Sequence, residues 1–502
     1  MIKKVLVANR GEIAIRVMRT CREMDIKTVA VYSDADRKSM HVRFADEAFH
    51  IGLSPSTESY LSIDKIIQAA KKSNADAIHP GYGFLSENAD FSARCQKEGI
   101  IFIGPSPHSI NMMGDKITSR QTMIKAGVPV VPGTVEPIED EKKAIETIKN
   151  IGLPVMIKAS AGGGGKGMRL VHHEDEIQSG IRSARSEAKA AFGNDAVYIE
   201  KYIASPHHIE FQVLADNHGN VIHLFERECS VQRRHQKVIE ETPSPLMTPE
   251  VRDKMGKDAV AAAKAADYSG AGTIEFIVDD NLNYYFLEMN TRLQVEHPIT
   301  ERVVGIDLVR EQINIANGLQ LSVKQEDLSQ HGHAIECRIY AEDPDNNFYP
   351  SPGLIQHITE PLGLGVRHDG YVYEGYEIPI YYDPLISKLI VWGTTREQAI
   401  ARMRRSLFNY KITGIKTTIK FLERIMYTPD FVNGNYNTHF IEKNRAFLEQ
   451  KDQCKGDCKA MAIIAAFIDY QNRLASAQQN NGIKPCAVGW KSAGRRMSLQ
   501  RL

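Results

Sequence analysis

The sequence predicts a mixed α/β protein, with a parallel sheet near the N-terminus and antiparallel hairpins beyond it. Three observations lead to this fold class. Strand and helix patterns alternate over residues 1–110, a glycine-rich loop at 162–167 directly follows an apolar strand, and 273–290 holds two apolar runs around a polar turn. A chain of 502 residues is also long enough for roughly three domains.

The first region alternates short apolar runs with amphipathic segments. We expect strands at 4–8, 27–32, 77–79 and 100–103, and helices at 12–24 and 62–73. Such alternation indicates a parallel sheet with crossover helices. The basic start of the chain resembles a signal peptide, but its apolar run ends at Asn9 and is too short for a secretory core. We therefore expect a buried first strand.

Two further units and a tail follow. One unit runs from about 115 to 317; the next, from about 330 to 446, opens with a strand pattern at 333–340 and ends with helix patterns near 396–409 and 416–426. The tail differs, because 460–476 has the apolar period of a helix and the polar stretch 477–482 predicts a loop.

Composition argues against some classes of partner. The 62 basic and 62 acidic residues balance, which disfavours nucleic acid or a membrane surface as the main partner. No apolar stretch reaches membrane-spanning length. Seven cysteines, mostly inside patterned segments, suit reduced thiols in the cytoplasm. Cys454, Cys458 and Cys486 leave a metal site open, although their spacing is not C-x-x-C.

The glycine-rich loop predicts a phosphate site. Gly162, Gly163, Gly164 and Gly165 are adjacent and would offer bare backbone N–H groups to phosphate oxygens. Lys158 and Lys166 can bring positive charge to the same phosphates. The spacing matches neither the P-loop nor the dinucleotide-binding pattern. The alternative is a flexible surface linker, but linkers rarely follow directly on a Val-Met-Ile-Lys strand.

The apolar runs within 273–290 predict a hairpin with two facing carboxylates. A turn centred on Asn281 and Leu282 would place Glu275 opposite Glu288, with Asn290 on the same face. Two facing carboxylates repel each other unless a cation lies between them, and oxygen ligands suit Mg²⁺. The alternative is a register slipped by one residue, which would turn both glutamates to solvent.

Each of two mixed-charge segments could form either a binding site or an exposed surface. Residues 226–241 taken alone predict a solvated charged stretch, with an anion site at Arg233, Arg234, His235 and Lys237 as the alternative. In 291–298, Arg292, Gln294 and Glu296 alternate and would offer a cation, an amide and a carboxylate on one face. Such a face could bind a small anion and remove its proton, or it could be a surface loop with a casual ion pair.

Long motifs in unbroken order resemble the signatures of biotin carboxylases. They are Val7–Ala14, His79–Asn88, Met113–Lys116, the glycine-rich loop, Gln232–Lys237 and Glu288–Pro298. The resemblance covers residues 1 to about 446. It implies an ATP-grasp fold with a Rossmann-like N-terminal domain over 1–114, an ATP-grasp domain over 115–317 carrying a mobile lid at about 132–203, and a C-terminal biotin carboxylase domain over 330–446. The extension 447–502 has no role that the resemblance indicates.

The resemblance also implies the ligand-binding residues. Those for ATP are Lys116, Lys158, Gly163, Gly164, Gly165, Lys166, Glu200, Lys201, Ile203, His208, Gln232 and His235; those for Mg²⁺ or Mn²⁺ are Glu275, Glu288 and Asn290; those for bicarbonate are Lys237, Arg292, Gln294, Val295 and Glu296. Lys237, Arg292, Glu296 and Arg338 would be catalytic, with Glu296 as the base for bicarbonate and Arg338 stabilising the biotin enolate. The implied reaction forms carboxyphosphate from ATP and bicarbonate and then carboxylates biotin.

The implied partners are separate proteins. The sequence contains no Ala-Met-Lys-Met biotinylation motif, so we expect biotin on a separate biotin carboxyl carrier protein, a separate carboxyltransferase and, by analogy, a homodimer. The expected role is the first half-reaction of an acetyl-CoA or propionyl-CoA carboxylase, as in fatty acid biosynthesis. The biotin carboxylase chain of a two-subunit pyruvate carboxylase, another ATP-grasp ligase and a non-enzymatic scaffold are the alternatives.

Overall fold

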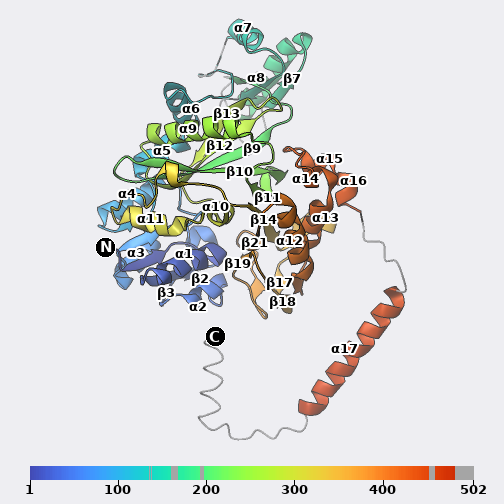
Figure 1. Ribbon diagram of the computed structural model, residues 1–502. Coiled ribbons are helices and arrows are strands. Elements are labelled where there is room, and N and C mark those ends of the chain that lie inside the picture. The colour runs from blue at the N-terminus through green and yellow to red at the C-terminus, as the bar shows by residue number, and fades with distance from the viewer. Residues whose placement is uncertain are drawn as a thin grey trace. The chain divides into compact units, whose positions relative to one another are not determined.

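The computed structural model describes residues 1–134, 136, 138, 140–159, 168–192, 197–450 and 458–480. The chain divides into two compact units, Met1–Leu448 and Glu449–Leu502 (Figure 1). Gly163, Gly164, Gly165 and Lys166 of the predicted phosphate loop lie outside the described residues, as do Cys454 and Cys486.

The N-terminal region forms the predicted parallel sheet. Its strands are β1 (Lys4–Val7), β2 (Lys27–Ser33), β3 (Glu47–Gly52), β4 (Ala77–His79) and β5 (Ile101–Phe102), in the order β3-β2-β1-β4-β5. All neighbours pair in parallel, and α1 (Gly11–Glu23), α3 (Ile63–Ser73) and α4 (Ala89–Lys97) lie between strands in the chain. The sequence patterns missed β3, because this edge strand is mostly partly exposed and carries few apolar residues.

An eight-stranded antiparallel sheet forms the centre of the first unit. Its order is β13 (Tyr284–Asn290), β12 (Gly270–Val278), β9 (His207–Ala215), β10 (Val221–Arg233), β11 (Gln236–Thr242), β14 (His333–Tyr340), β21 (Leu385–Gly393) and β19 (Val366–Gly370). The pairing of β11 with β14 joins the strands of 207–290 to those after 333. The side chains of both regions therefore meet on one continuous surface.

Helices cover this sheet, and α9 (Pro249–Ala265) begins at a clear sequence signal. Thr248 caps α9 by accepting a hydrogen bond from the backbone of Val251, and proline fills the first turn. α10 (His297–Val304) and α11 (Leu308–Ala316) follow β13. α12 (Arg396–Asn409) and α13 (Ile419–Tyr427) match the predicted helices and pack with Ile335, Cys337 and Ile339 in one core.

The elements between 140 and 201 form a small body with its own core. A three-stranded sheet of order β7-β6-β8 combines β6 (Val155–Ala159), β7 (Met168–Val171) and β8 (Val197–Lys201). α7 (Glu141–Ile151) and α8 (Ile177–Phe192) pack on it through Ile148, Ile157 and Ile181, which are fully buried. This core contains no residue of the central sheet, so the body is held together independently (Figure 1).

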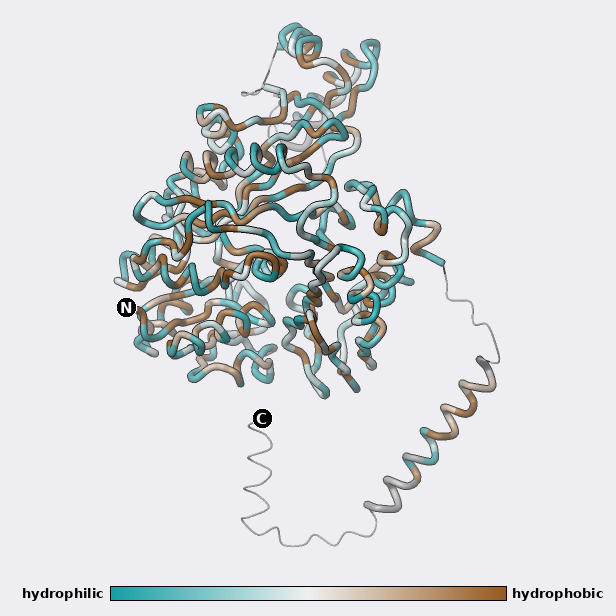
Figure 2. Tube along the Cα trace, viewed as in Figure 1, coloured by the Kyte–Doolittle hydropathy of each residue, from teal (hydrophilic) through white to brown (hydrophobic). Residues whose placement is uncertain are grey.

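The second unit contains one described helix, α17 (Cys458–Asn480), along which hydrophobic residues recur (Figure 2). The helix predicted at 460–476 is confirmed, but the loop predicted at 477–482 is wrong for 477–480, because the helix continues through these polar residues. Among the described residues, none of the helices combines the length and apolar character needed to cross a bilayer.

Candidate active site

The β12–β13 hairpin brings two glutamates face to face. Glu275 pairs with Glu288, and Thr273 with Asn290, which is the register that the sequence predicted. The turn itself is displaced by one residue: the Asp279 amide donates to the Asn283 carbonyl at 2.9 Å, and Leu282 has a φ of 63°. A bulge at Leu287, between the Phe276–Phe286 and Glu275–Glu288 pairs, restores the register.

The facing carboxylates fit a divalent cation. Partial desolvation, together with the facing Glu275 carboxylate, raises the pKa of Glu288. Asn290 Nδ2 donates a 2.9 Å hydrogen bond to Glu275 Oε1, so an amide lies beside the pair. Oxygen donors from short side chains on rigid strands suit Mg²⁺, which would remove the repulsion between the two acids.

Lys237 lies at the centre of a cluster of carboxylates. The β10–β11 turn has positive φ at both Arg234 and His235, as a type I′ turn requires, and it sets Lys237 opposite Gln232. Lys237 Nζ donates to Glu296 Oε1 at 2.6 Å, to Glu275 Oε1 at 2.9 Å and also to Glu210. Although burial opposes charge, these three acids raise the pKa of Lys237 well above its usual range.

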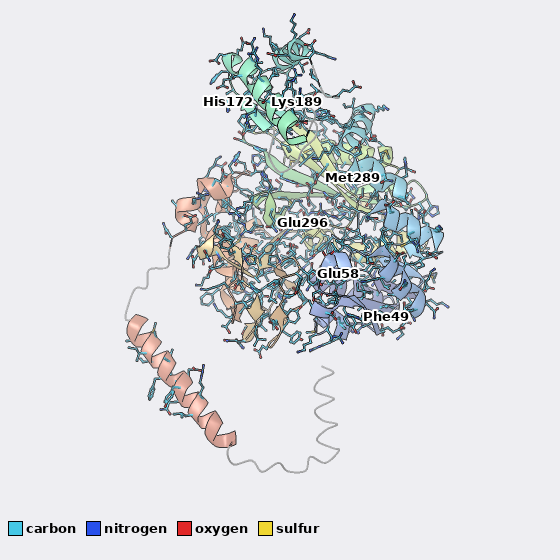
Figure 3. All side chains as sticks on the ribbon, turned by 180° about the vertical axis from the view of Figure 1, so that it is seen from behind. Phe49, Glu58, His172, Lys189, Met289 and Glu296 are labelled. Atoms are coloured by element: carbon cyan, nitrogen blue, oxygen red, sulfur yellow. The ribbon has the colours of Figure 1, made fainter. Side chains whose placement is uncertain are left out.

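Glu296 is fully buried immediately before α10 and lies in the interior of the first unit (Figure 3). Besides Lys237 it accepts a 2.9 Å hydrogen bond from Arg338 Nη2. Burial alone would raise its pKa, but Lys237 and Arg338 hold the pKa of Glu296 well below the ordinary range. It becomes a stronger base only when an anion draws these two cations away.

Residues 291–296 form a loop, not a strand, yet the loop gathers the predicted polar groups. Arg292 donates from Nε to Glu87 Oε2 at 2.8 Å and from Nη1 to Gln294 Oε1 at 2.9 Å. Gln294 Nε2 donates to Glu275 Oε1 at 3.0 Å, and the carbonyl of Val295 accepts from Lys388 Nζ at 2.9 Å. Arg292 and Gln294 therefore lie beside the carboxylate cluster with their polar groups ordered.

The predicted nucleotide residues divide between the small body and the central sheet. Lys158 Nζ on β6 lies 2.5 Å from Glu200 Oε2 on β8. Lys201 Nζ donates to the carbonyls of Gly152 and Leu153, and its backbone N–H donates to the Pro132 carbonyl at 2.7 Å. Lys116 is exposed at the first position of α6 (Lys116–Lys125), and Ile203 follows β8.

One of these residues, His208, contacts the carboxylate cluster directly, and Gln232 contacts His208. His208 Nε2 lies 2.8 Å from Glu275 Oε2, and its Nδ1 lies 3.0 Å from Gln232 Nε2. Although burial opposes it, Glu275 raises the pKa of His208. His235 is exposed at the tip of the β10–β11 turn.

The structure corrects two expectations for residues 226–241. The segment is not a solvated stretch, because Glu226, Glu228, Glu240 and Glu241 are buried in the β10–β11 hairpin. The four basic residues also do not converge on one anion site. Arg233 pairs with Glu342 at 2.7 Å and covers the Phe348 ring, and Arg234 donates to Asn347, whereas Lys237 points to the carboxylates.

Sequence reasoning missed Glu210 and Arg227. Arg227 Nε donates to Glu210 Oε1 at 2.5 Å, and both side chains are fully buried. The signal was present in β9, where His208, Glu210 and Gln212 place polar groups at every second position of an apolar strand. Such a row on a buried strand indicates a polar site rather than a core face.

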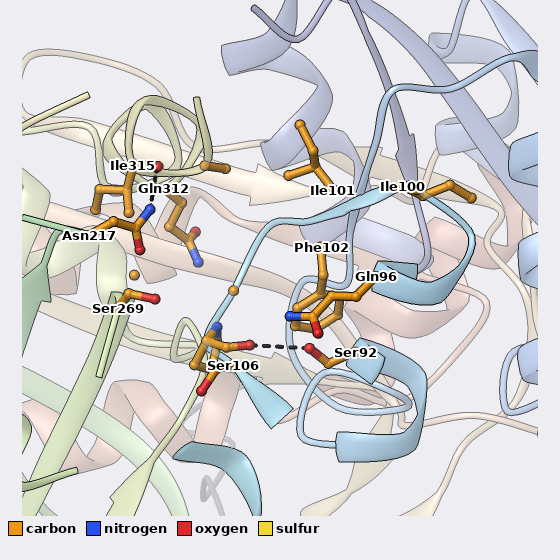
Figure 4. Close-up of a pocket in the computed structure, with 15 residues that line it drawn as sticks. Ser92, Gln96, Ile100, Ile101, Phe102, Ser106, Asn217, Ser269, Gln312 and Ile315 are labelled. Atoms are coloured by element: carbon orange, nitrogen blue, oxygen red, sulfur yellow. Dashed lines mark hydrogen bonds between the residues drawn. The ribbon is translucent and has the colours of Figure 1, made fainter. Parts of the chain in front are cut away.

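A hollow of about 430 Å³ lies between α4, β5 and α11 (Figure 4). Its lining includes Gln96, Asn217 and Gln312 and no charged side chain. A nucleotide phosphate would find no cation there, so the charged cluster around Lys237 is the better candidate site.

Comparisons with known proteins identify the family of the chain. The family described as biotin carboxylase, N-terminal domain, matches residues 1–110, and the biotin carboxylase C-terminal domain matches 336–443. The ATP-binding domain of the carbamoyl-phosphate synthase L chain matches 115–324.

Three relatives illustrate the similarity. Biotin carboxylase 1 of Bacillus subtilis is 56% identical over 443 residues, which are 88% of this chain and 98% of that protein. The pyruvate carboxylase A subunit of Methanothermobacter thermautotrophicus is 57% identical over 445 residues, 89% of this chain and 90% of that protein. The solved biotin carboxylase domain dimer of Hydrogenobacter thermophilus 2-oxoglutarate carboxylase, with MgADP, ADP and bicarbonate, has 50% identity and a TM-score of 0.82 over 90% of this chain and 100% of that one.

Proposed function

This chain belongs to the biotin carboxylase family and is an ATP-dependent ligase, and we propose that it carboxylates biotin on a separate carrier protein in two stages. One observation carries the proposal: Lys237 joins the candidate base Glu296 to the candidate metal ligand Glu275 in one buried cluster. The groups that would hold the metal and those that would bind bicarbonate therefore lie in the same cluster.

In the first stage, a bicarbonate oxygen attacks the γ-phosphorus of ATP, the bond to the β–γ bridging oxygen breaks and ADP leaves. Arg292, Gln294, the Val295 backbone and Lys237 bind bicarbonate, and its proton passes to Glu296. When bound at Glu275, Glu288 and Asn290, Mg²⁺ or Mn²⁺ supplies positive charge to the phosphate oxygens. Lys116 and Lys158 offset further phosphate charge, and His208, Gln232 and His235 complete the nucleotide site.

In the second stage, carboxyphosphate gives up its carboxyl group to biotin. The carbon–oxygen bond to phosphate breaks, a bond forms to N1 of biotin, and the departing phosphate takes the N1 proton. Arg338 stabilises the negative charge that develops on the ureido oxygen of biotin. Its position beside Glu296 at 2.9 Å supports this role, because the carboxyl group is then made and used within reach of the same side chains.

We assign three domains, 1–114, 115–317 and 330–446, and a lid at about 132–203 within the second. The separate core of α7, α8 and the β6–β8 sheet supports the lid, since a body with its own core can move as a unit. Glu200, Lys201 and Ile203 at its base are proposed to hold the adenine. Closure would exclude water from carboxyphosphate.

A homodimer is the proposed assembly. Leu362 and Leu364 are 77% and 84% exposed in the loop before β19, and Phe408 on α12 is 63% exposed. A β-carbon on Gly363 or Gly365 would meet Arg405 or Arg402 of α12, so loop and helix lie together. Large apolar side chains gathered on one surface suit a contact between two copies of the chain. Light scattering should give a mass twice that of one chain, and Leu364→Asp should lower the measured mass toward that of one chain.

The test of function is ADP release by the purified chain with MgATP, bicarbonate and free biotin. ADP release that requires bicarbonate and rises with biotin supports the proposal, whereas release that needs an amine instead of biotin would overturn it in favour of another ligase. The carboxyltransferase then decides the acceptor. We propose that the acceptor is an acyl-CoA. Because the chain is similar to a pyruvate carboxylase subunit, the captured biotinylated partner should be tested with pyruvate as well as with acyl-CoA.

A further inference from the structure

Two carboxylates hold the Arg338 guanidinium, and they hold it unequally. Glu240 Oε1 accepts a hydrogen bond from Arg338 Nε at 2.6 Å and lies 2.5 Å from Arg338 Nη2. Glu296 Oε2 accepts only from Nη2, at 2.9 Å. Because contacts at Nε and at one amino group together fix the plane of a guanidinium, Glu240 sets its orientation.

The contact between Glu240 and Arg338 is built into the middle of the central sheet. Glu240 on β11 pairs with Glu336 on β14, and Arg338 lies two residues further on the same strand. Ile335, Cys337 and Ile339 of β14 belong to the hydrophobic core, so Glu336 and Arg338 share the opposite face. Arg338 is only 8% exposed and Glu240 fully buried, so neighbouring strands restrain both side chains.

A third carboxyl group leaves this contact in place. Glu336 is fully buried and, within the described part of the chain, neither of its oxygens has a hydrogen-bond partner. It faces Glu240 from β11, Lys388 from β21 and Glu296 before α10, and burial with the nearby Glu240 raises the pKa of Glu336 well above its usual range. Because neither oxygen of Glu336 bonds to Arg338, Glu336 does not compete with Glu240 for the guanidinium.

We propose that Glu240 is the positioning residue that holds Arg338 in place for the biotin-dependent second stage. This inference rests on the proposed function. When Glu296 takes the bicarbonate proton it loses its charge and its attraction for Arg338, whereas Glu240 keeps its two contacts. Arg338 can then exchange its bond to Glu296 for one to biotin without losing its orientation.

The first test compares two rates in Glu240→Gln. ADP is released when carboxyphosphate forms, and without biotin the carboxyphosphate is then hydrolysed to bicarbonate and phosphate. Biotin-independent ADP release therefore reports the first stage, and the increment with free biotin reports the second. Loss of the carboxyl oxygen that accepts from Arg338 Nε should lower the biotin-dependent rate by about 10- to 100-fold. The biotin-independent rate should fall by a clearly smaller factor, and an equal fall in both would overturn the proposal.

A double-mutant cycle separates positioning from a structural role. If Glu240 acts through Arg338, adding Glu240→Gln to Arg338→Gln should change the biotin-dependent rate less than about 2-fold further, since coupled effects are not additive. Full additivity would overturn the proposal. Glu336→Gln is the matched control, because it replaces the facing buried acid with a neutral isostere; a loss as large as that of Glu240→Gln would also overturn it.

Failure of this inference differs from failure of the proposed function. If the unaltered chain shows no biotin-dependent ADP release, the function itself fails. If the unaltered chain is active and Glu240→Gln is equally active, only the positioning role fails. Should Glu240→Gln not fold, Glu240→Asp keeps the charge but shortens its reach, and the same split between the two rates is expected.

Discussion

Lys237 Nζ donates a 2.6 Å hydrogen bond to Glu296 Oε1, a residue 59 positions later in the chain. The same ammonium group contacts Glu275 and Glu210, so one cation lies against three buried acids. This arrangement keeps Glu296 ionised and ready to accept a proton, but it also makes Glu296 a weak base until bicarbonate occupies Lys237.

Replacing Lys237 with glutamine should therefore damage bicarbonate binding most. We expect the KM for bicarbonate to rise at least about 10-fold, while the KM for ATP changes less, because a buried charge pair that loses one partner costs about 3–5 kcal/mol. Steady-state ADP release with each substrate varied checks this. Lys257→Gln, which removes an exposed ion pair with Asp253, is the control and should match the unaltered chain.

The facing glutamates predict a dependence on metal concentration. Glu288→Gln should raise the Mg²⁺ concentration for half-maximal rate by about 10-fold or more, because one of the two anionic ligands is lost. Chelation with EDTA should abolish the rate and added Mg²⁺ or Mn²⁺ should restore it. Glu58→Gln, at an exposed acid away from the sheet, should leave the Mg²⁺ titration unchanged; an unchanged titration for Glu288→Gln would remove it from the ligand set.

Arg292 should not tolerate lysine. Its three nitrogens reach Glu87, Asn290 and Gln294 at 2.8–2.9 Å, and a single ammonium cannot reproduce this fork. We expect Arg292→Lys to lower kcat/KM for bicarbonate by about 10- to 100-fold. Arg94→Lys, in a partly exposed pair with Glu98, should have no effect. Equal activity of both variants would show that charge alone suffices at residue 292.

Buried His79 predicts a loss of stability in mild acid. Burial lowers the pKa of His79 from 6.5 to about 4. Its contribution is complete above the unfolded-state pKa and is lost as pH falls from 6.5 toward 4, because only the unfolded chain binds the proton readily. At pH 5.5 the cost is about 1.4 kcal/mol.

When the pH is lowered from 7.5 to 5.5, the midpoint of thermal unfolding should therefore fall less in His79→Asn than in the unaltered chain. His439→Asn, at a partly exposed histidine, should keep the full pH dependence. An identical pH dependence in His79→Asn would show that this imidazole does not contribute.

Local patterns in the sequence were sufficient for the strands and helices that are strongly periodic. Apolar spacing predicts the parallel sheet of the first region, the strand at 333–340 and helix α12, because that spacing decides which face can be buried. The pairing of Glu275 with Glu288 was also predictable. The way in which this pairing arises could not be predicted, because the turn is displaced and a bulge at Leu287 restores the register.

The charged segment 226–241 shows where such reasoning ends. A run rich in Glu, Arg and Lys has the composition of a solvated surface, and nothing local indicates burial. In the folded chain Glu241 is buried and accepts hydrogen bonds from Arg396 and His333, which lie 155 and 92 residues away. Partners so distant in the chain decide whether a charge can be buried.

The sequence by itself determined the secondary structure of the periodic segments, the hairpin acids and, through its long motifs, the family. Only the tertiary structure decided that Lys237 separates from Arg233 and Arg234, that Glu210 and Arg227 belong to the cluster, and that Glu240 holds Arg338. The reason is physical: periodicity reports which face of an element meets water, whereas the ionisation and orientation of a buried polar group depend on charges brought to it from other strands.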